Sequence, residues 1–176
     1  MRDLPDGKSS LLNSLARNRA EVLIIRFIHY LGVTMWIGGW LAAVLMSSGV
    51  RGESPQVRVR VAALVARVQT VLVGPGALIT VGSGILWTMA LAGGGAVENR
   101  VAPIGTSVMT GAGILGGILI AVLAIPSALK LKAVSVSSND GRVLPVFERQ
   151  ERRLNVVSAV AGVCALISLF ASVLAP

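Results

Sequence analysis

Four long stretches of the chain contain no Asp, Glu, Lys or Arg, and short polar segments separate them. They are between 23 and 30 residues long and cover 27–50, 68–97, 101–129 and 154–176. About 20 apolar residues in a helix are enough to cross a hydrocarbon core of roughly 30 Å. Backbone amides in lipid must bond within their own segment, so helices are expected rather than the short alternating strands of a barrel.

This pattern predicts an all-α fold, a polytopic membrane protein whose four transmembrane helices form an antiparallel bundle. The predicted domain covers 22–176, with helices at about 22–49, 64–92, 101–130 and 153–175. Three glycines at 93–95 are expected to end the second helix, and the residues 137–141 have the composition of a turn. Pro75 indicates either a kink in the second helix or a late start to it.

The N-terminal segment, residues 1–21, is polar, but Leu11, Leu12 and Leu15 recur in it at helical spacing. Two interpretations fit this pattern equally. The segment is either a disordered tail or a short amphipathic helix that lies on the membrane surface.

Composition supports lipid as the surroundings of the chain. Hydrophobic residues make up 54% and charged residues only 14%, against about 25% charged residues in a typical soluble domain. The net charge is +8, but the basic residues flank the apolar runs, where they meet anionic lipid head groups. We therefore expect the lipid bilayer as a partner and no nucleic acid.

The distribution of Lys and Arg also predicts a sidedness. The two termini and the second loop together carry 6 of these residues, and the first and third loops carry 10. Because cytoplasmic loops are enriched in basic residues, the excess favours both termini outside, although the basic N-terminal segment argues the other way.

Small residues on each predicted helix mark surfaces where helices can approach closely. Helices in lipid gain no hydrophobic energy by associating, so close backbone approach matters more. The expected packing positions are Gly32, Gly39, Gly76, Gly84, Gly113, Gly117 and Gly162. One of these surfaces could face another subunit, and the spacing alone does not separate the two options.

The first helix contains the candidate cofactor site, His29 and Trp36. The two residues are seven apart and share a helix face, with Gly32 between them. An imidazole can ligate the metal of haem or chlorophyll, and a neighbouring glycine lets a flat macrocycle approach. The alternative is structural: His29 lies near the start of the apolar run, where it can meet water or head groups, and Trp36 is a packing group.

Other chemistry is not apparent in the sequence, so no catalytic residues are predicted and no enzyme is expected. The chain has one histidine and one cysteine, Cys164, whereas structural zinc needs about four ligands; no metal site is predicted. The apolar runs contain no carboxylate, which argues against a proton- or cation-coupled transporter.

The segment from His29 to Gly39, with His followed after six residues by Trp-Ile-Gly-Gly, resembles a family of uncharacterised bacterial integral membrane proteins with four predicted helices. That family is similar in look to the membrane part of copper-resistance D-type proteins. Arg58 and Arg67 in a basic first loop, and the end of the second helix at Gly84 to Trp87, fit the same pattern. The resemblance covers roughly 22–176. It implies a multi-pass protein of the bacterial inner membrane and, by analogy with copper- or haem-handling relatives, a ligand role for His29.

Three functional hypotheses follow. The first is a non-catalytic accessory or scaffold subunit that packs against other subunits of a larger membrane complex, such as a respiratory or photosynthetic electron-transport complex. The second is a haem- or copper-binding membrane protein that uses His29. The third is a small transporter.

Overall fold

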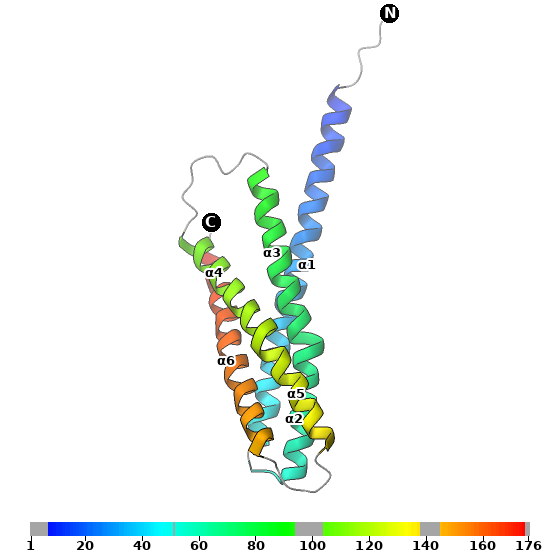
Figure 1. Ribbon diagram of the computed structural model, residues 1–176. Helices are drawn as coiled ribbons and strands as arrows, with labels where there is room; N and C mark the ends of the chain where they lie inside the picture. Colours follow the sequence, from blue (N-terminus) through cyan, green and yellow to red (C-terminus); the bar gives the residue numbers. More distant parts are fainter. Residues whose placement is uncertain (1–6, 51, 94–103, 138–144, 175–176) are drawn as a thin grey trace, which may run out of the picture.

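The computed structural model describes residues 7–50, 52–93, 104–137 and 145–174, and this part of the chain is helical without any strand (Figure 1). Its elements follow the chain in order as α1 (Gly7–Gly49), α2 (Pro55–Val68), η1 (Gln69–Val73), α3 (Gly74–Gly93), α4 (Ile104–Leu119), η2 (Ile120–Ala124), α5 (Ile125–Ser137) and α6 (Pro145–Leu174). The elements α2, η1 and α3 form one continuous helix, and α4, η2 and α5 form another.

Four helices in the described part of the chain are long and apolar enough to span a membrane, which suggests a multi-pass membrane protein. The spanning stretches are Arg19–Gly49, Pro55–Met89, Ser107–Ala133 and Pro145–Ser172. The prediction of an all-helical chain with four such helices is thus confirmed.

The helices begin at earlier residues than the uncharged runs of the sequence predicted. Helix α1 starts at Gly7, so the described part of the predicted N-terminal segment continues directly into the first apolar helix. The second helix starts at Pro55 and the last at Pro145. Proline is favoured in the first turn of a helix because its missing N–H would have no helical partner there. Charged residues therefore lie within these helices, and the predicted boundaries near 64 and 153 are several residues late.

Two π-helical turns interrupt the α-helical hydrogen bonding. The Gly74 N–H donates to the Gln69 carbonyl, and the Ile125 N–H donates to the Ile120 carbonyl. A proline follows each turn, Pro75 in one case and Pro126 in the other. Proline cannot donate a backbone hydrogen bond and clashes with the carbonyl four residues earlier, and a wider turn accommodates it. Of the two interpretations of Pro75, a kink or a late start, the late start is wrong, because the helix runs from Pro55 through Pro75.

The structure describes α3 as far as Gly93, so the predicted end of the second helix stays a prediction. The glycines that follow it, and most of the predicted turn at 137–141, lie outside the described residues.

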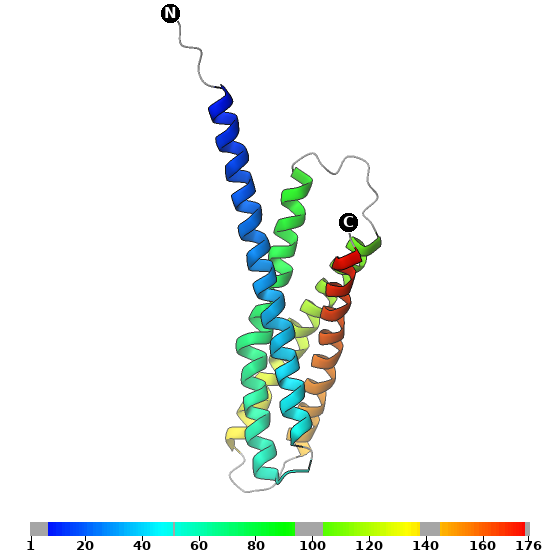
Figure 2. The ribbon, with the colours of Figure 1, turned by 180° about the vertical axis from the view of Figure 1, so that it is seen from behind.

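The helices associate mainly in two pairs, α1 with α3 and α4 with α6, and α2 packs beside α5. Figures 1 and 2 show the pairs close together at the end formed by α2 and α5 and further apart at the opposite end, where the N-terminal part of α1 extends beyond its neighbours. Helix α1 has 43 residues, which corresponds to about 65 Å at 1.5 Å per residue.

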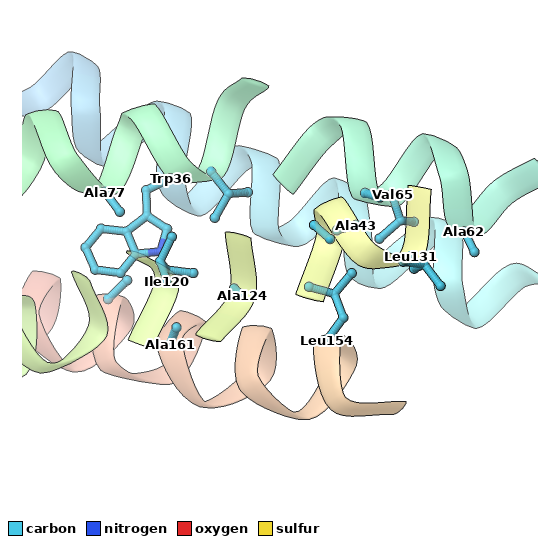
Figure 3. Close-up of a cluster of buried hydrophobic side chains, with 14 of the residues drawn as sticks. Trp36, Ala43, Ala62, Val65, Ala77, Ile120, Ala124, Leu131, Leu154 and Ala161 are labelled. Atoms are coloured by element: carbon cyan, nitrogen blue, oxygen red, sulfur yellow. The ribbon is translucent and has the colours of Figure 1, made fainter. Parts of the chain in front are cut away.

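A core of small and medium-sized side chains joins the pairs (Figure 3). Trp36 is its largest member and lies between Ala77, Ile120 and Ala161 from three other elements. Further along the helices, Val65 and its neighbours form the part of the core near α2 and α5. Most of the large apolar side chains outside this core are exposed, as expected for surfaces that face lipid.

Candidate functional site

His29 lies on α1 and is held by α3. Its Nδ1 is 3.0 Å from the backbone carbonyl oxygen of Thr80 and 3.1 Å from Oγ of Ser83. Ser83 lies one turn after Ile79 and its hydroxyl donates to the Ile79 carbonyl. The imidazole thus joins α1 to one turn of α3.

These contacts fix the tautomer of the imidazole. A backbone carbonyl can only accept a hydrogen bond, so Nδ1 of His29 carries the proton and donates it to Thr80. In the neutral ring, Nε2 then carries the lone pair. An imidazole oriented in this way by a carbonyl is the usual arrangement of a metal-ligating histidine, and it is equally a satisfied helix-packing group.

Aromatic and basic groups border the imidazole. The rings of His29 and Trp87 meet edge to face with centroids 5.8 Å apart, and the Arg26 guanidinium lies over the Trp87 ring at 5.2 Å. Gly84 provides the space beneath the imidazole, because a Cβ there would lie 3.3 Å from His29 Cε1. The cluster of Arg26, His29, Gly84 and Trp87 is held between α1 and α3.

The other predicted cofactor residue, Trp36, does not share this setting. Its side chain is buried, and its ring lies against Gly116 on α4, a position that Cys164 of α6 also borders. The glycine between the two candidates, Gly32, is covered by α3, since a Cβ there would lie 2.8 Å from both the backbone nitrogen and Oγ1 of Thr80. The space that the sequence suggested for a flat macrocycle beside Gly32 is therefore filled by protein.

All seven predicted packing glycines lie where an added Cβ would meet another helix. Four of them lie between α1 and the helix made of η1 and α3: Gly32, Gly39, Gly76 and Gly84. The other three meet single side chains: Gly113 faces Ser168, Gly117 faces Val81, and Gly162 faces the indole of Trp40. By contrast, Gly38, Gly82 and Gly111 have open space at the Cβ position.

Sequence reasoning missed several buried positions. Gly116 lies under the Trp36 ring, and Gly74 lies against Ile125, the residue that directly follows the second π-turn. Gln69 is 1% exposed, and its Nε2 donates a hydrogen bond of 2.8 Å to Ser158 Oγ on α6. The available signal was Gln69 itself, a polar amide side chain near the start of an uncharged run of 30 residues.

The end of the bundle formed by α2 and α5 carries an interhelical ion pair. The Arg58 guanidinium on α2 lies 3.1 Å from the Glu151 carboxylate on α6. Both side chains are partly exposed, so the pair is expected to contribute little to stability. Among the described residues, no group of three or more His, Cys, Asp or Glu side chains is placed to hold a metal ion.

Comparisons with known proteins give no relative from which a function could be transferred. No family model matches the chain, and no curated protein or solved structure matches it. The function is therefore inferred from the geometry of the helices and from the residues between them.

Proposed function

We propose that the protein is a non-catalytic integral membrane subunit that crosses the bilayer as an antiparallel four-helix bundle and packs against a larger membrane complex. The bacterial inner membrane is the proposed location, with both termini outside, and the complex is proposed to be respiratory or photosynthetic. The resemblance to bacterial four-helix membrane proteins supports the location alone.

The observation that supports this role best is that polar groups in the helices bind other helices of the same chain. His29 Nδ1 bonds to α3, and Gln69 Nε2 bonds to α6. Side chains used in this way build a rigid helical unit. They favour a structural role over a catalytic one.

The length of α1 supports docking to a partner. A helix of about 65 Å exceeds the roughly 30 Å hydrocarbon core by far, so one end of α1 extends beyond the bilayer. Among the helices that the structure describes, none lies beside this N-terminal end (Figure 1). Leu23, Ile24 and Phe27, at the start of the spanning part, are 63%, 58% and 68% exposed. A partner subunit would have both a projecting helix and an apolar surface to bind.

The test is native extraction. The tagged chain, expressed at native level, is extracted in a mild detergent and its size is measured by native electrophoresis and chromatography. We expect it to migrate with the same partner polypeptides in a fixed ratio. The double variant Leu11→Glu/Leu15→Glu, in the projecting part of α1, should release them, whereas the control Ser10→Glu/Asn13→Glu should not. Migration of the wild-type chain as a free 18.2 kDa species would contradict the proposal.

A second candidate, haem or copper binding at His29, is favoured by one observation. The Thr80 carbonyl orients the imidazole so that Nε2 holds its lone pair. His29 would hold a haem or copper through Nε2, and the bound group would supply redox chemistry. Because α3 closes the space beside Gly32, a macrocycle would have to lie outside the α1–α3 contact.

This candidate is tested by the absorption spectrum and metal content of protein purified from cells supplied with haem and copper. Binding at His29 predicts a Soret band or one equivalent of copper that is lost in His29→Ala and retained in the control Gly38→Ala. A colourless, metal-free wild-type protein would exclude it.

A further inference from the structure

Four buried side-chain polar atoms lack hydrogen-bond partners among the described residues, and two of them belong to Trp36 and Gln150. The other two lie in membrane-spanning helices and border one turn of α6. One is an acceptor, Oε1 of Gln69, and the other is a donor, the indole Nε1–H of Trp40. Gln69 is almost completely buried, at 1% exposure. A buried polar atom without a hydrogen bond is unfavourable, and in lipid no bulk water is at hand to reduce that cost.

Both atoms border the same turn of α6. The amide of Gln69 reaches Ser158, and the indole of Trp40 lies against Gly162, with Nε1 among the atoms nearest to the Cβ position there. Ser158 and Gly162 are four residues apart on one helix face, so their Cβ positions are about 5–6 Å apart.

The contact between α1 and η1 also places Trp40 and Gln69 near each other. Gly39, next to Trp40 in the chain, lies against Val73, the residue one turn beyond Gln69 in η1. Side chains from α1 and η1 therefore reach α6 at the turn from Ser158 to Gly162.

One atom of the Gln69 amide lacks a hydrogen-bond partner in either orientation of the amide. Exchanging its oxygen and nitrogen would let Ser158 donate to the oxygen and would leave the amide N–H without a partner instead. In both orientations one amide atom and the Trp40 N–H remain. A ligand for them must accept from the indole N–H, and it must either donate to the amide oxygen or accept from the amide N–H; water can do either within a small space.

We propose that one ordered water molecule bridges the Trp40 indole N–H and the Gln69 side-chain amide between α1, η1 and α6. The water accepts from Nε1 of Trp40 and donates to Oε1 of Gln69. Buried waters in proteins typically make about three hydrogen bonds to groups that otherwise lack them. This site requires neither a partner subunit nor a cofactor and is independent of the proposed function.

The test is nuclear magnetic resonance of the full chain, labelled with ¹⁵N-tryptophan, in lipid nanodiscs. Trp40→Phe assigns the Nε1–H signal of Trp40. We expect this signal to show a dipolar cross peak at the water frequency, with the sign that distinguishes it from hydrogen exchange. We also expect its exchange with deuterium to be slow, because the site is buried.

The matched variants are Gln69→Met, which keeps side-chain volume and removes the amide, and Gly38→Ala, which adds a methyl group in open space. The water cross peak should disappear in the first and persist in the second. Absence of the peak in the wild-type chain would overturn the proposal, as would a direct cross peak from Trp40 to the Gln69 side chain in its place. Exchange of the Trp40 proton within seconds would indicate bulk water and would also overturn it. The wild-type spectrum decides the question even if Gln69→Met does not fold.

Discussion

The α1–α3 contact and the contact of α1 with α6 both depend on glycine, but they use it differently. In the first, Gly76 faces backbone: a Cβ there would lie 2.7 Å from the Trp36 nitrogen and 2.9 Å from the Gly32 oxygen. In the second, Gly162 faces a side chain, the indole of Trp40. The same residue type therefore serves close backbone approach in one place and provides a recess for an aromatic ring in the other. A backbone cannot move aside as a side chain can, so the two contacts should respond differently to substitution.

The largest effect is expected for Gly76→Ala. The added methyl group meets two backbone atoms of α1 and can be accommodated only by moving the helices apart, so we expect a loss of about 3 kcal/mol in the free energy of unfolding, the upper end for overpacking. The measurement is unfolding in mixed detergent micelles titrated with dodecyl sulfate. The control, Gly82→Ala on the same helix, adds a methyl group in open space and should be neutral or stabilising by up to about 1 kcal/mol. Equal effects of the two variants would contradict the close-approach interpretation.

A smaller effect that can be rescued is expected for Gly162→Ala. The methyl group overlaps the Trp40 ring, which can change its rotamer, so we expect a loss of about 1–2 kcal/mol. In a Trp40→Leu background most of this loss should vanish, a coupling within the range of about 0.5–3 kcal/mol for residues in contact. Trp36→Leu should not rescue Gly76→Ala in the same assay, because that contact involves the backbone of residue 36. Independent, additive effects of Gly162→Ala and Trp40→Leu would show that the ring does not fill this recess.

The hydrogen bonds of His29 should contribute less than either glycine contact. Interhelical hydrogen bonds in membrane proteins are worth about 0.6 kcal/mol on average, and His29→Ala also removes ring packing against Gly84. We expect His29→Ala to lower the free energy of unfolding by about 1 kcal/mol and Ser83→Ala, which leaves the bond to the Thr80 carbonyl, to lower it by about half of that. A larger loss for Ser83→Ala than for His29→Ala would contradict the assignment of the carbonyl as the main partner.

The smallest effect is expected for the ion pair at the end of the bundle. Arg58 and Glu151 have side chains 32% and 20% exposed, and pairs of this kind contribute about 0–1 kcal/mol. A double-mutant cycle of Arg58→Ala and Glu151→Ala should give a coupling in that range, and it should decrease as salt is added. A coupling above about 2 kcal/mol that is insensitive to salt would show that this pair behaves as a buried one.

The spanning helices and the glycine positions could be predicted from the sequence because each depends on one local requirement. A long uncharged run needs lipid, and a glycine at regular spacing permits close approach. The arrangement of Trp36 and Gln69 could not be predicted in this way. The spacing of His29 and Trp36 places both on one face of a helix, but that face is wide enough for one side chain to meet α3 and the other to reach α4.

Helix starts were also misjudged, for a different physical reason. Arg58, Arg60 and Arg67 lie within the helix that begins at Pro55, because the ends of a spanning helix reach the head groups, where long basic side chains are favourable. The residue at which an uncharged run begins therefore marks the edge of the hydrocarbon core of the membrane and not the start of the helix.

The two π-turns have a consequence for how this chain can change in length. A π-turn holds one residue more than the α-helical turn it replaces. The helical segments before and after it are therefore oriented as they would be in an unbroken α-helix that is one residue shorter. Losing one residue between Gln69 and Val73, or between Ile120 and Ala124, would leave both flanking faces where they are. A deletion elsewhere in either helix would rotate everything beyond it by about 100°. Natural homologues one residue shorter should therefore place the gap at these two turns.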